Sequence, residues 1–169
     1  MPKFIDIMKN LYSKTYCILV CLALLVGIAS CSKDDVSKDT VEKLESFSIA
    51  KEILQLVNIH RGSIGNEPLE MNTLATDLAN EHTLYMIGQN DINHDDFDRR
   101  SDRLFDEENA SRTGENVAYG QRSAEDVMEA WLNSTEHRKN IEGDFTHIGI
   151  GVIKNNVGIY YFTQLFFKK

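Results

Sequence analysis

Cysteine is scarce in this chain of 169 residues, and its distribution is uneven. The three cysteines are Cys17, Cys21 and Cys31, so none follows residue 31. Without thiols, the later part of the chain can form no disulfide, no thiolate zinc site and no cysteine nucleophile. A domain formed by that part must therefore be held together by packing alone.

Long apolar segments are also missing. The apolar run from Tyr16 to Ala29 holds 14 residues, whereas a membrane-spanning helix needs about 20. Lys3, Lys9 and Lys14 precede the run, which is the layout of a secretory signal. We therefore predict that residues 1–30 are a signal peptide and not a transmembrane anchor.

The end of this run, Ile28-Ala29-Ser30-Cys31, resembles the lipobox of bacterial lipoproteins. In such proteins a diacylglycerol is attached to the cysteine thiol, and cleavage makes this cysteine the first residue. The resemblance implies a lipid on Cys31 that ties the protein to a membrane, with an ordinary cleaved signal as the alternative. Ser32-Lys33-Asp34-Asp35 is similar to the surface-export signal of Bacteroidetes-type lipoproteins. We expect an outer membrane lipoprotein of the cell envelope, exposed at the surface if that second signal operates.

Basic side chains are outnumbered once the signal is gone. Loss of residues 1–30 removes three Lys and one Asp, which leaves 15 basic and 25 acidic side chains and a net charge of −10. This acidity disfavours nucleic acid and anionic lipid headgroups as partners. The remaining 139 residues suffice for one core. We expect the lipidated cysteine and a flexible tether at residues 31–42, followed by one domain at residues 43–169.

Apolar periodicity predicts the helices. Apolar residues recur at three- and four-residue steps from Val41 to His60, which indicates an amphipathic helix. Further helices are expected after three N-cap candidates, Asn72, Ser123 and Ser134. Residues 89–113 are polar and charge-rich, and we expect only one short helix there, near residues 101–108.

The pattern changes to that of strands after Gly143. Apolar and small residues alternate from His147 to Val152, and a nearly continuous apolar run follows from Ile159 to Phe167. With Asn155-Asn156 between them, these runs predict a β-hairpin. Helices before a terminal hairpin predict an α+β fold in which a small antiparallel sheet lies between helices.

Five short motifs occur in a characteristic order. They are Gly114-Glu115-Asn116-Val117-Ala118, Trp131-Leu132-Asn133-Ser134, His137-Arg138-Lys139-Asn140-Ile141, Ile148-Gly149-Ile150-Gly151-Val152 and Tyr161-Phe162-Thr163-Gln164. Together they resemble the CAP superfamily, which groups cysteine-rich secretory proteins, antigen 5 and pathogenesis-related proteins with bacterial exported proteins. The resemblance covers about residues 50–167. It implies a three-layer α-β-α sandwich with a three-stranded antiparallel sheet.

The resemblance also implies a polar cleft. Animal members place two His and two Glu over the sheet, where they can bind a divalent metal such as zinc. His94 and Glu115 match one of each, whereas Ser134 and Tyr161 stand at the positions of the second Glu and the second His. His137, at a position where bacterial members carry a histidine, is a third candidate metal ligand beside His94 and Glu115. We predict a cleft formed by these five residues, with zinc or another divalent cation as its candidate cofactor.

Alternative roles for the cleft residues stay open. They either hold a metal or form a hydrogen-bonded cluster that ties loops to the sheet. Ser134 and His137 as nucleophile and base are disfavoured, because the chain shows no nucleophile elbow or oxyanion loop. His82 lies on an apolar helical stripe, so we expect a buried core histidine there.

Three functions are compatible with these features. The first is a non-catalytic binding module at the cell envelope, anchored through Cys31, that takes a small apolar ligand, a glycan or a protein. Members of the CAP superfamily have been linked with sterol and fatty-acid binding and with cell-wall or host interaction, and nothing in these residues selects among those ligands. The alternative is a metal-assisted hydrolase that uses the His/Glu cleft. The third is a structural or adhesive surface protein in which the polar cluster only stabilises the fold.

Overall fold

The computed structural model describes residues 37–169. The predicted signal peptide, Cys31 and the first part of the predicted tether lie outside these residues. Residues 37–169 form one compact unit. Within this unit, no helix is both long and apolar enough to cross a bilayer.

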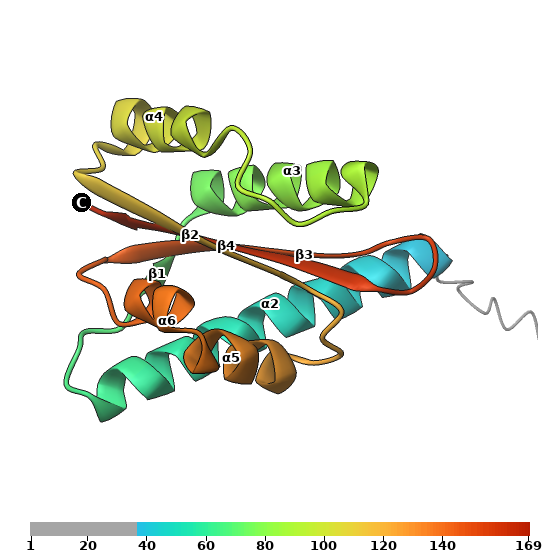
Figure 1. Ribbon diagram of the computed structural model, residues 1–169, viewed down its shortest axis with the longest axis horizontal. Helices are drawn as coiled ribbons and strands as arrows, with labels where there is room; N and C mark the ends of the chain where they lie inside the picture. Colours follow the sequence, from blue (N-terminus) through green and yellow to red (C-terminus); the bar gives the residue numbers. More distant parts are fainter. Residues whose placement is uncertain (1–36) are drawn as a thin grey trace, which may run out of the picture. The chain divides into compact units, whose positions relative to one another are not determined.

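Helices cover both faces of a central sheet (Figure 1). The helices α3 and α4 lie on one face, and α2, α5 and α6 lie on the other. The helices are α2 (Lys38–Ser63), α3 (Thr73–Gln89), α4 (Phe97–Glu108), α5 (Ala124–Asn133) and α6 (Thr135–Ile141). The strands are β1 (Glu70–Met71), β2 (Arg112–Tyr119), β3 (His147–Lys154) and β4 (Tyr160–Lys168). The expected α+β fold with three layers is confirmed.

The sheet has the order β1-β3-β4-β2. β4 pairs with β3 and with β2 in antiparallel fashion, as expected. The sheet has one strand more than the three expected, because the two-residue strand β1 pairs with β3 in parallel. Two backbone bonds hold β1 there: Glu70 N donates to Thr146 O at 3.0 Å and Asn72 N donates to Ile148 O at 2.9 Å.

The first helix begins earlier than predicted. α2 starts at Lys38, and the Ser37 side chain accepts a hydrogen bond from Thr40 N at 3.2 Å. This serine cap satisfies an amide that the first helical turn leaves without a partner. Residues 38–42 are therefore helical, and the part of the predicted tether at 31–42 that overlaps them is corrected.

The other predicted caps differ in their chemistry. Asn72 accepts from Ala75 N at 2.9 Å at the start of α3, and Ser123 accepts from Asp126 N at 3.2 Å at the start of α5. Ser134 precedes α6 at the expected position, but its side chain makes no cap bond. The N-cap predictions are thus right in position, while the Ser134 hydroxyl does not serve the amides of α6.

Two glycines let α3 lie directly on β3. A Cβ atom at Gly149 would come within 2.0 Å of the Ala75 carbonyl carbon, and one at Gly151 within 2.6 Å of the corresponding atom of Ala79. Because these neighbours are backbone atoms, no side-chain rotation could relieve the overlap. The alternation of glycine with apolar residues along β3 therefore sets how closely α3 packs on the sheet.

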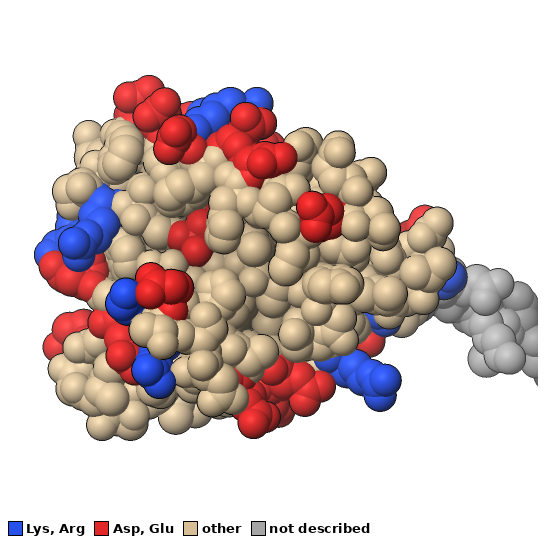
Figure 2. All heavy atoms as spheres, viewed as in Figure 1, with Lys and Arg blue, Asp and Glu red and all other residues tan. Residues whose placement is uncertain are grey.

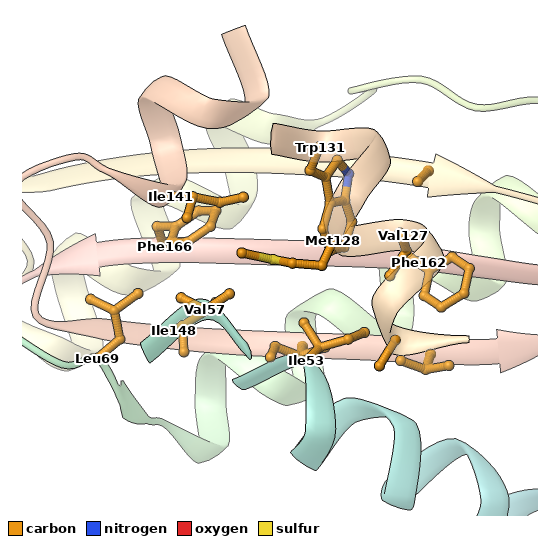
Figure 3. Close-up of a cluster of buried hydrophobic side chains, with 14 of the residues drawn as sticks. Ile53, Val57, Leu69, Val127, Met128, Trp131, Ile141, Ile148, Phe162 and Phe166 are labelled. Carbon is orange, nitrogen blue, oxygen red and sulfur yellow. The ribbon is translucent and has the colours of Figure 1, made fainter. Parts of the chain in front are cut away.

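The larger core lies between the sheet and the layer of α2, α5 and α6 (Figure 3). Trp131 of α5 is fully buried in it, with its ring edge-on to Phe162 at 6.3 Å between centroids. The indole nitrogen of Trp131 donates to Val117 O at 3.3 Å, so its one polar atom has a partner. A smaller cluster, which includes Leu78, Leu104 and Phe167, fills the opposite face under α3 and α4.

A buried arginine joins the end of α2 to the end of α6 and to the loops before β1 and β3. Arg61 is almost fully buried, and its guanidinium donates to four backbone carbonyls. The acceptors are Glu67 O and Ile141 O at 2.8 Å each, Gly143 O at 2.8 Å and Phe145 O at 3.2 Å. These four charge-assisted bonds hold the end of α2, the end of α6 and the two loops together.

Candidate functional site

A buried ion pair forms the centre of the polar cluster. Glu115 lies on β2, and its side chain is only 1% exposed. Arg100 of α4 donates to both carboxylate oxygens: Nε to Oε2 at 2.8 Å and Nη2 to Oε1 at 2.8 Å. This two-point contact matches the planar fork of the guanidinium to the carboxylate. A third guanidinium nitrogen donates to Asp95 O at 2.7 Å, which fixes the loop before α4.

His94 joins this pair from the same loop. Its Nδ1 lies 2.8 Å from Glu115 Oε1, while 52% of its side chain is exposed. Because the carboxylate is held by Arg100 and can only accept, Nδ1 is the donor. This leaves Nε2 as the one polar atom of the ring that a ligand can reach. The predicted proximity of His94 and Glu115 is thus found in the structure.

His82 of α3 is the fourth member of the cluster. Its Nε2 lies 2.8 Å from Asn93 O and 3.8 Å from Glu115 Oε1, and its side chain is buried. Since a carbonyl can only accept, Nε2 carries the hydrogen. Burial lowers the pKa of His82, and the nearby Glu115 carboxylate partly opposes this effect. His82 is therefore a neutral buried histidine with a satisfied hydrogen bond.

His137 approaches from the other helical layer. Burial lowers its pKa, and the charge of His94 lowers it further. The ring of His137 makes no hydrogen bond to Glu115; only its carbonyl is bonded, by Asn116 Nδ2 at 3.1 Å.

Ser134 and Tyr161 lie apart from the Glu115 carboxylate. Ser134 is half-buried at the junction of α5 and α6. Tyr161 is buried against Met86 and Val117, and its ring lies 5.5 Å from that of Tyr119. Of the five predicted cleft residues, the structure joins only His94 and Glu115 by a direct hydrogen bond.

The donor set does not fit a zinc centre. Both oxygens of Glu115 already accept from Arg100, whose positive charge stands where a cation would have to bind. Within residues 37–169, no group of three or more His, Cys, Asp and Glu side chains is arranged to hold a metal. The predicted triad of His94, Glu115 and His137 would have to displace the arginine before it could bind an ion.

Arg100 is the residue that sequence reasoning missed. It follows Arg99, which is exposed, in a segment where charges of both signs alternate. The available signal was weak: a partner for the carboxylate of Glu115 was required, because a buried charge is rarely left unpaired. Nothing in the spacing identified which arginine supplies it.

The other side of β2 carries a second polar network. Asn116 Nδ2 donates to Gln164 Oε1 at 3.0 Å, and Asn116 Oδ1 accepts from Asn140 Nδ2 at 2.8 Å. Asn140 also donates to Glu115 O at 3.0 Å. Residues from three of the sequence motifs thus tie β2, β4 and α6 together. Their role in this network is to hold the fold.

An apolar groove lies away from the polar cluster, between α2, α3 and the β1–β3 edge of the sheet. Its volume is about 590 Å³. The apolar walls are Phe47, Ala50, Leu54, Met71, Ile150, Val152 and Ile153. Its polar lining includes Glu42, Lys43 and Ser46 of the first turns of α2.

A smaller pocket of about 200 Å³ lies between α3 and α4 beside His82 and Arg100, and its lining is mainly charged.

Comparison with known proteins identifies the family. The model of the cysteine-rich secretory protein family, CAP, matches residues 54–166, about two thirds of the chain. The chain belongs to the CAP family. Two uncharacterized proteins of Bacillus subtilis are each 33% identical to it: YkwD over 112 residues and the membrane protein YlbC over 138 residues. The alignments cover 62% and 79% of this chain but only 42% and 38% of the relatives, so this CAP protein spans about two fifths of their length.

Two solved structures share the fold of this chain. An extracellular protein with an SCP domain from Bacillus anthracis is 28% identical, with a TM-score of 0.68 over 79% of this chain and 44% of that one. An outer surface protein from Borrelia burgdorferi is 24% identical, with a TM-score of 0.66 over 72% of this chain and 93% of that one. The Bacillus anthracis structure supports membership of the family, and the Borrelia structure supports the fold.

Proposed function

We propose that this CAP protein is an exported, lipid-anchored binding module of the cell envelope, and that its apolar groove takes a small ligand with a hydrocarbon chain. The lipobox-like sequence at Cys31 supports the anchor. The extracellular protein of Bacillus anthracis and the outer surface protein of Borrelia burgdorferi, which share the fold, support the location. The groove between α2 and α3 supports the binding role.

The size and lining of the groove carry the proposal. A volume of about 590 Å³ lies within the range of about 300–1,000 Å³ that is typical of small-molecule sites. Six of its wall residues are aliphatic or methionine side chains and one is Phe47, while charged groups lie among its polar lining. Such walls bind a ligand by burying hydrocarbon, and the polar lining, which also includes Lys51, Thr76, Asn80 and Lys154, can hold a polar head group. An apolar ligand is therefore favoured over a glycan.

The polar cluster does not favour the alternative, a metal-assisted hydrolase. A general base or metal ligand needs a lone pair that is free to act, and Arg100 and His94 already bind the carboxylate of Glu115. The imidazoles of His94 and His137 remain, but two ligands are fewer than the three that a catalytic metal site uses. His82 is buried with its Nε2 hydrogen donated to Asn93 O. The arrangement stabilises the loop before α4, and this is the role that the hydrogen-bonded-cluster interpretation assigned to it.

A fluorescent fatty-acid analogue tests the binding role. We expect saturable binding to the purified protein with a single site, and competition by unlabelled fatty acid. Ala50→Trp should fill the groove and abolish binding, whereas Ile59→Trp, on the exposed part of α2 outside the groove, should not. Circular dichroism of both variants would check that the fold is intact. Binding that is unsaturable, or equal in the two variants, would contradict the proposal.

A further inference from the structure

The two most exposed large apolar side chains in residues 37–169 lie near the same end of the fold. Phe47, in the first half of α2, is 70% exposed, and Val157, in the turn between β3 and β4, is 72% exposed. An ion pair holds these elements together, because Lys154 Nζ lies 2.9 Å from Glu45 Oε2. Figure 1 shows the β3–β4 turn beside the first turns of α2.

Three more exposed apolar residues belong to this end: Val41 and Leu44 on α2, and Ile159 next to the turn. We call these five side chains the proximal patch. Isolated exposed apolar residues are normal on a protein surface, but several gathered at one end indicate a contact surface. Val41, Leu44 and Phe47 recur at steps of three, the pattern of a helix that packs against an apolar partner. Nothing in residues 37–169 covers them.

The position of the predicted lipid indicates the partner. Cys31 precedes Ser37 by six residues, and a fully extended chain spans at most about 3.6 Å per residue, or about 20 Å here. A lipid on Cys31 therefore keeps the start of α2 within about 20 Å of the bilayer. The proximal patch lies on the first turns of α2 and on the turn next to them, so it is the part of the domain that the anchor brings closest to the membrane.

We propose that the proximal patch rests on the bilayer that holds the lipid of Cys31. This inference depends on the lipid anchor proposed above. Glu42, Lys43 and Ser46, which line the groove, belong to these same turns of α2. One end of the groove then lies beside the membrane surface, where a hydrocarbon ligand can pass between bilayer and groove with little exposure to water.

Charge is not the driving force of this contact. Lys38, Asp39, Glu42 and Lys43 place both signs at the start of α2, and acidic and basic groups are interspersed on the face shown in Figure 2. Interfacial contacts of this kind gain their energy from buried apolar area. The contact should therefore persist in high salt and on neutral as well as anionic vesicles.

Single cysteines provide a clean test. Residues 32–169 contain no cysteine and Cys31 would be blocked by its lipid, so an introduced cysteine is the only free thiol of the mature protein. The full lipidated chain, with an environment-sensitive dye on Phe47→Cys or Val157→Cys, is reconstituted into phosphatidylethanolamine/phosphatidylglycerol vesicles containing doxyl-labelled lipid. Ile59→Cys and Leu84→Cys are matched controls, because these apolar residues are also exposed but lie outside the patch.

Quenching by the doxyl groups of at least about twofold at residues 47 and 157, with little at 59 and 84, would support the proposal, since only an interfacial dye meets the acyl region. Equal quenching at all four positions in an anchored protein would overturn the docking but leave the anchor and the groove standing. A protein that does not stay with the vesicles would overturn both proposals. A third outcome is that the dyes at 47 and 157 are unquenched but become shielded from water as the protein concentration rises. This result would assign the patch to a contact with a second copy of the chain and overturn the membrane contact.

Discussion

Arg100 holds Glu115 with two hydrogen bonds of 2.8 Å in the interior of the fold. Both side chains are nearly inaccessible to solvent. A pair of this kind is costly to disrupt, because removal of one partner leaves the other charge buried without compensation. The motif glutamate of this CAP protein is therefore engaged in structure, and this has measurable consequences.

Glu115→Ala should lower the free energy of unfolding by about 3–5 kcal/mol, because the guanidinium of Arg100 would stay buried without its partner. Urea denaturation at pH 7 measures this change. The control is Glu107→Ala, which removes the exposed ion pair between Glu107 and Arg103 within α4. This substitution should lower the free energy of unfolding by less than about 1 kcal/mol. Equal effects of the two substitutions would contradict the structural role of Glu115. Affinity for the fatty-acid analogue should be unchanged in both variants, because neither residue lines the groove.

The pair also shows where sequence reasoning stops. Arg99 and Arg100 are adjacent, yet the first is exposed and the second buried. Their burial differs because α4 lies over β2, and Glu115 on that strand contacts only Arg100. Local periodicity carries no information about that strand, so the sequence predicted the carboxylate of Glu115 and the neighbouring His94 but not the arginine that neutralises the carboxylate.

Acid should destabilise the protein through His82. Burial lowers the pKa of His82 below the ordinary value of 6.5, so the unfolded state takes up this proton more readily than the folded state. The free energy of unfolding therefore rises with pH, and the stability that neutral His82 contributes is lost as the pH falls below about 6.5. Arg100, His94 and Glu115 surround the ring, and protonation would place another positive charge beside the two basic groups.

Urea midpoints measured between pH 7.5 and 5 check this expectation. His82→Gln keeps a donor that can reach Asn93 O but does not titrate, so its stability should fall less steeply over this range. His137, whose pKa is also lowered, contributes in the same direction, and some slope should remain in the variant. A slope that is identical with and without His82 would contradict the assignment.

Gly149→Ala should be among the most damaging single changes in the sheet. Its new Cβ would meet the carbonyl carbon of Ala75 at 2.0 Å, and α3 could relieve this only by moving off the sheet. We expect a loss of at least about 3 kcal/mol, the upper range for overpacking, since backbone atoms are involved. Gly62→Ala is the matched control, because Gly62 lies in α2 and no atom lies within 4 Å of the added carbon. The higher helix propensity of alanine should stabilise this variant by up to about 1 kcal/mol. Thermal melts would compare the two, and similar melting temperatures would contradict the close packing of α3.

The helices show the same division between what the pattern predicted and what it missed. The apolar stripe of α2 predicted the burial of Ile53 and Val57, and both are fully buried. The same stripe continues through Leu44 and Phe47, which are exposed, because the core contacts of α2 begin only near Ile49. Periodicity identifies an apolar face but does not show how far a partner extends along it. The glycines of β3 are a similar case, since their alternation predicted the strand but not the helix that lies on them.

The anchor itself gives the last prediction. If a lipid is attached to Cys31, the protein should sediment with membranes and incorporate a labelled fatty acid. Cys31→Ser should abolish both properties, because the hydroxyl of serine replaces the only thiol that remains after cleavage. Cys17→Ser is the matched control, since residue 17 lies in the predicted signal and leaves with it. Mass spectrometry of the mature chain would give the decisive result: an N-terminus at residue 31 carrying acyl chains supports the anchor. An unmodified N-terminus at any other residue, or membrane binding that survives Cys31→Ser, would contradict it and remove the reason for placing the proximal patch against a bilayer.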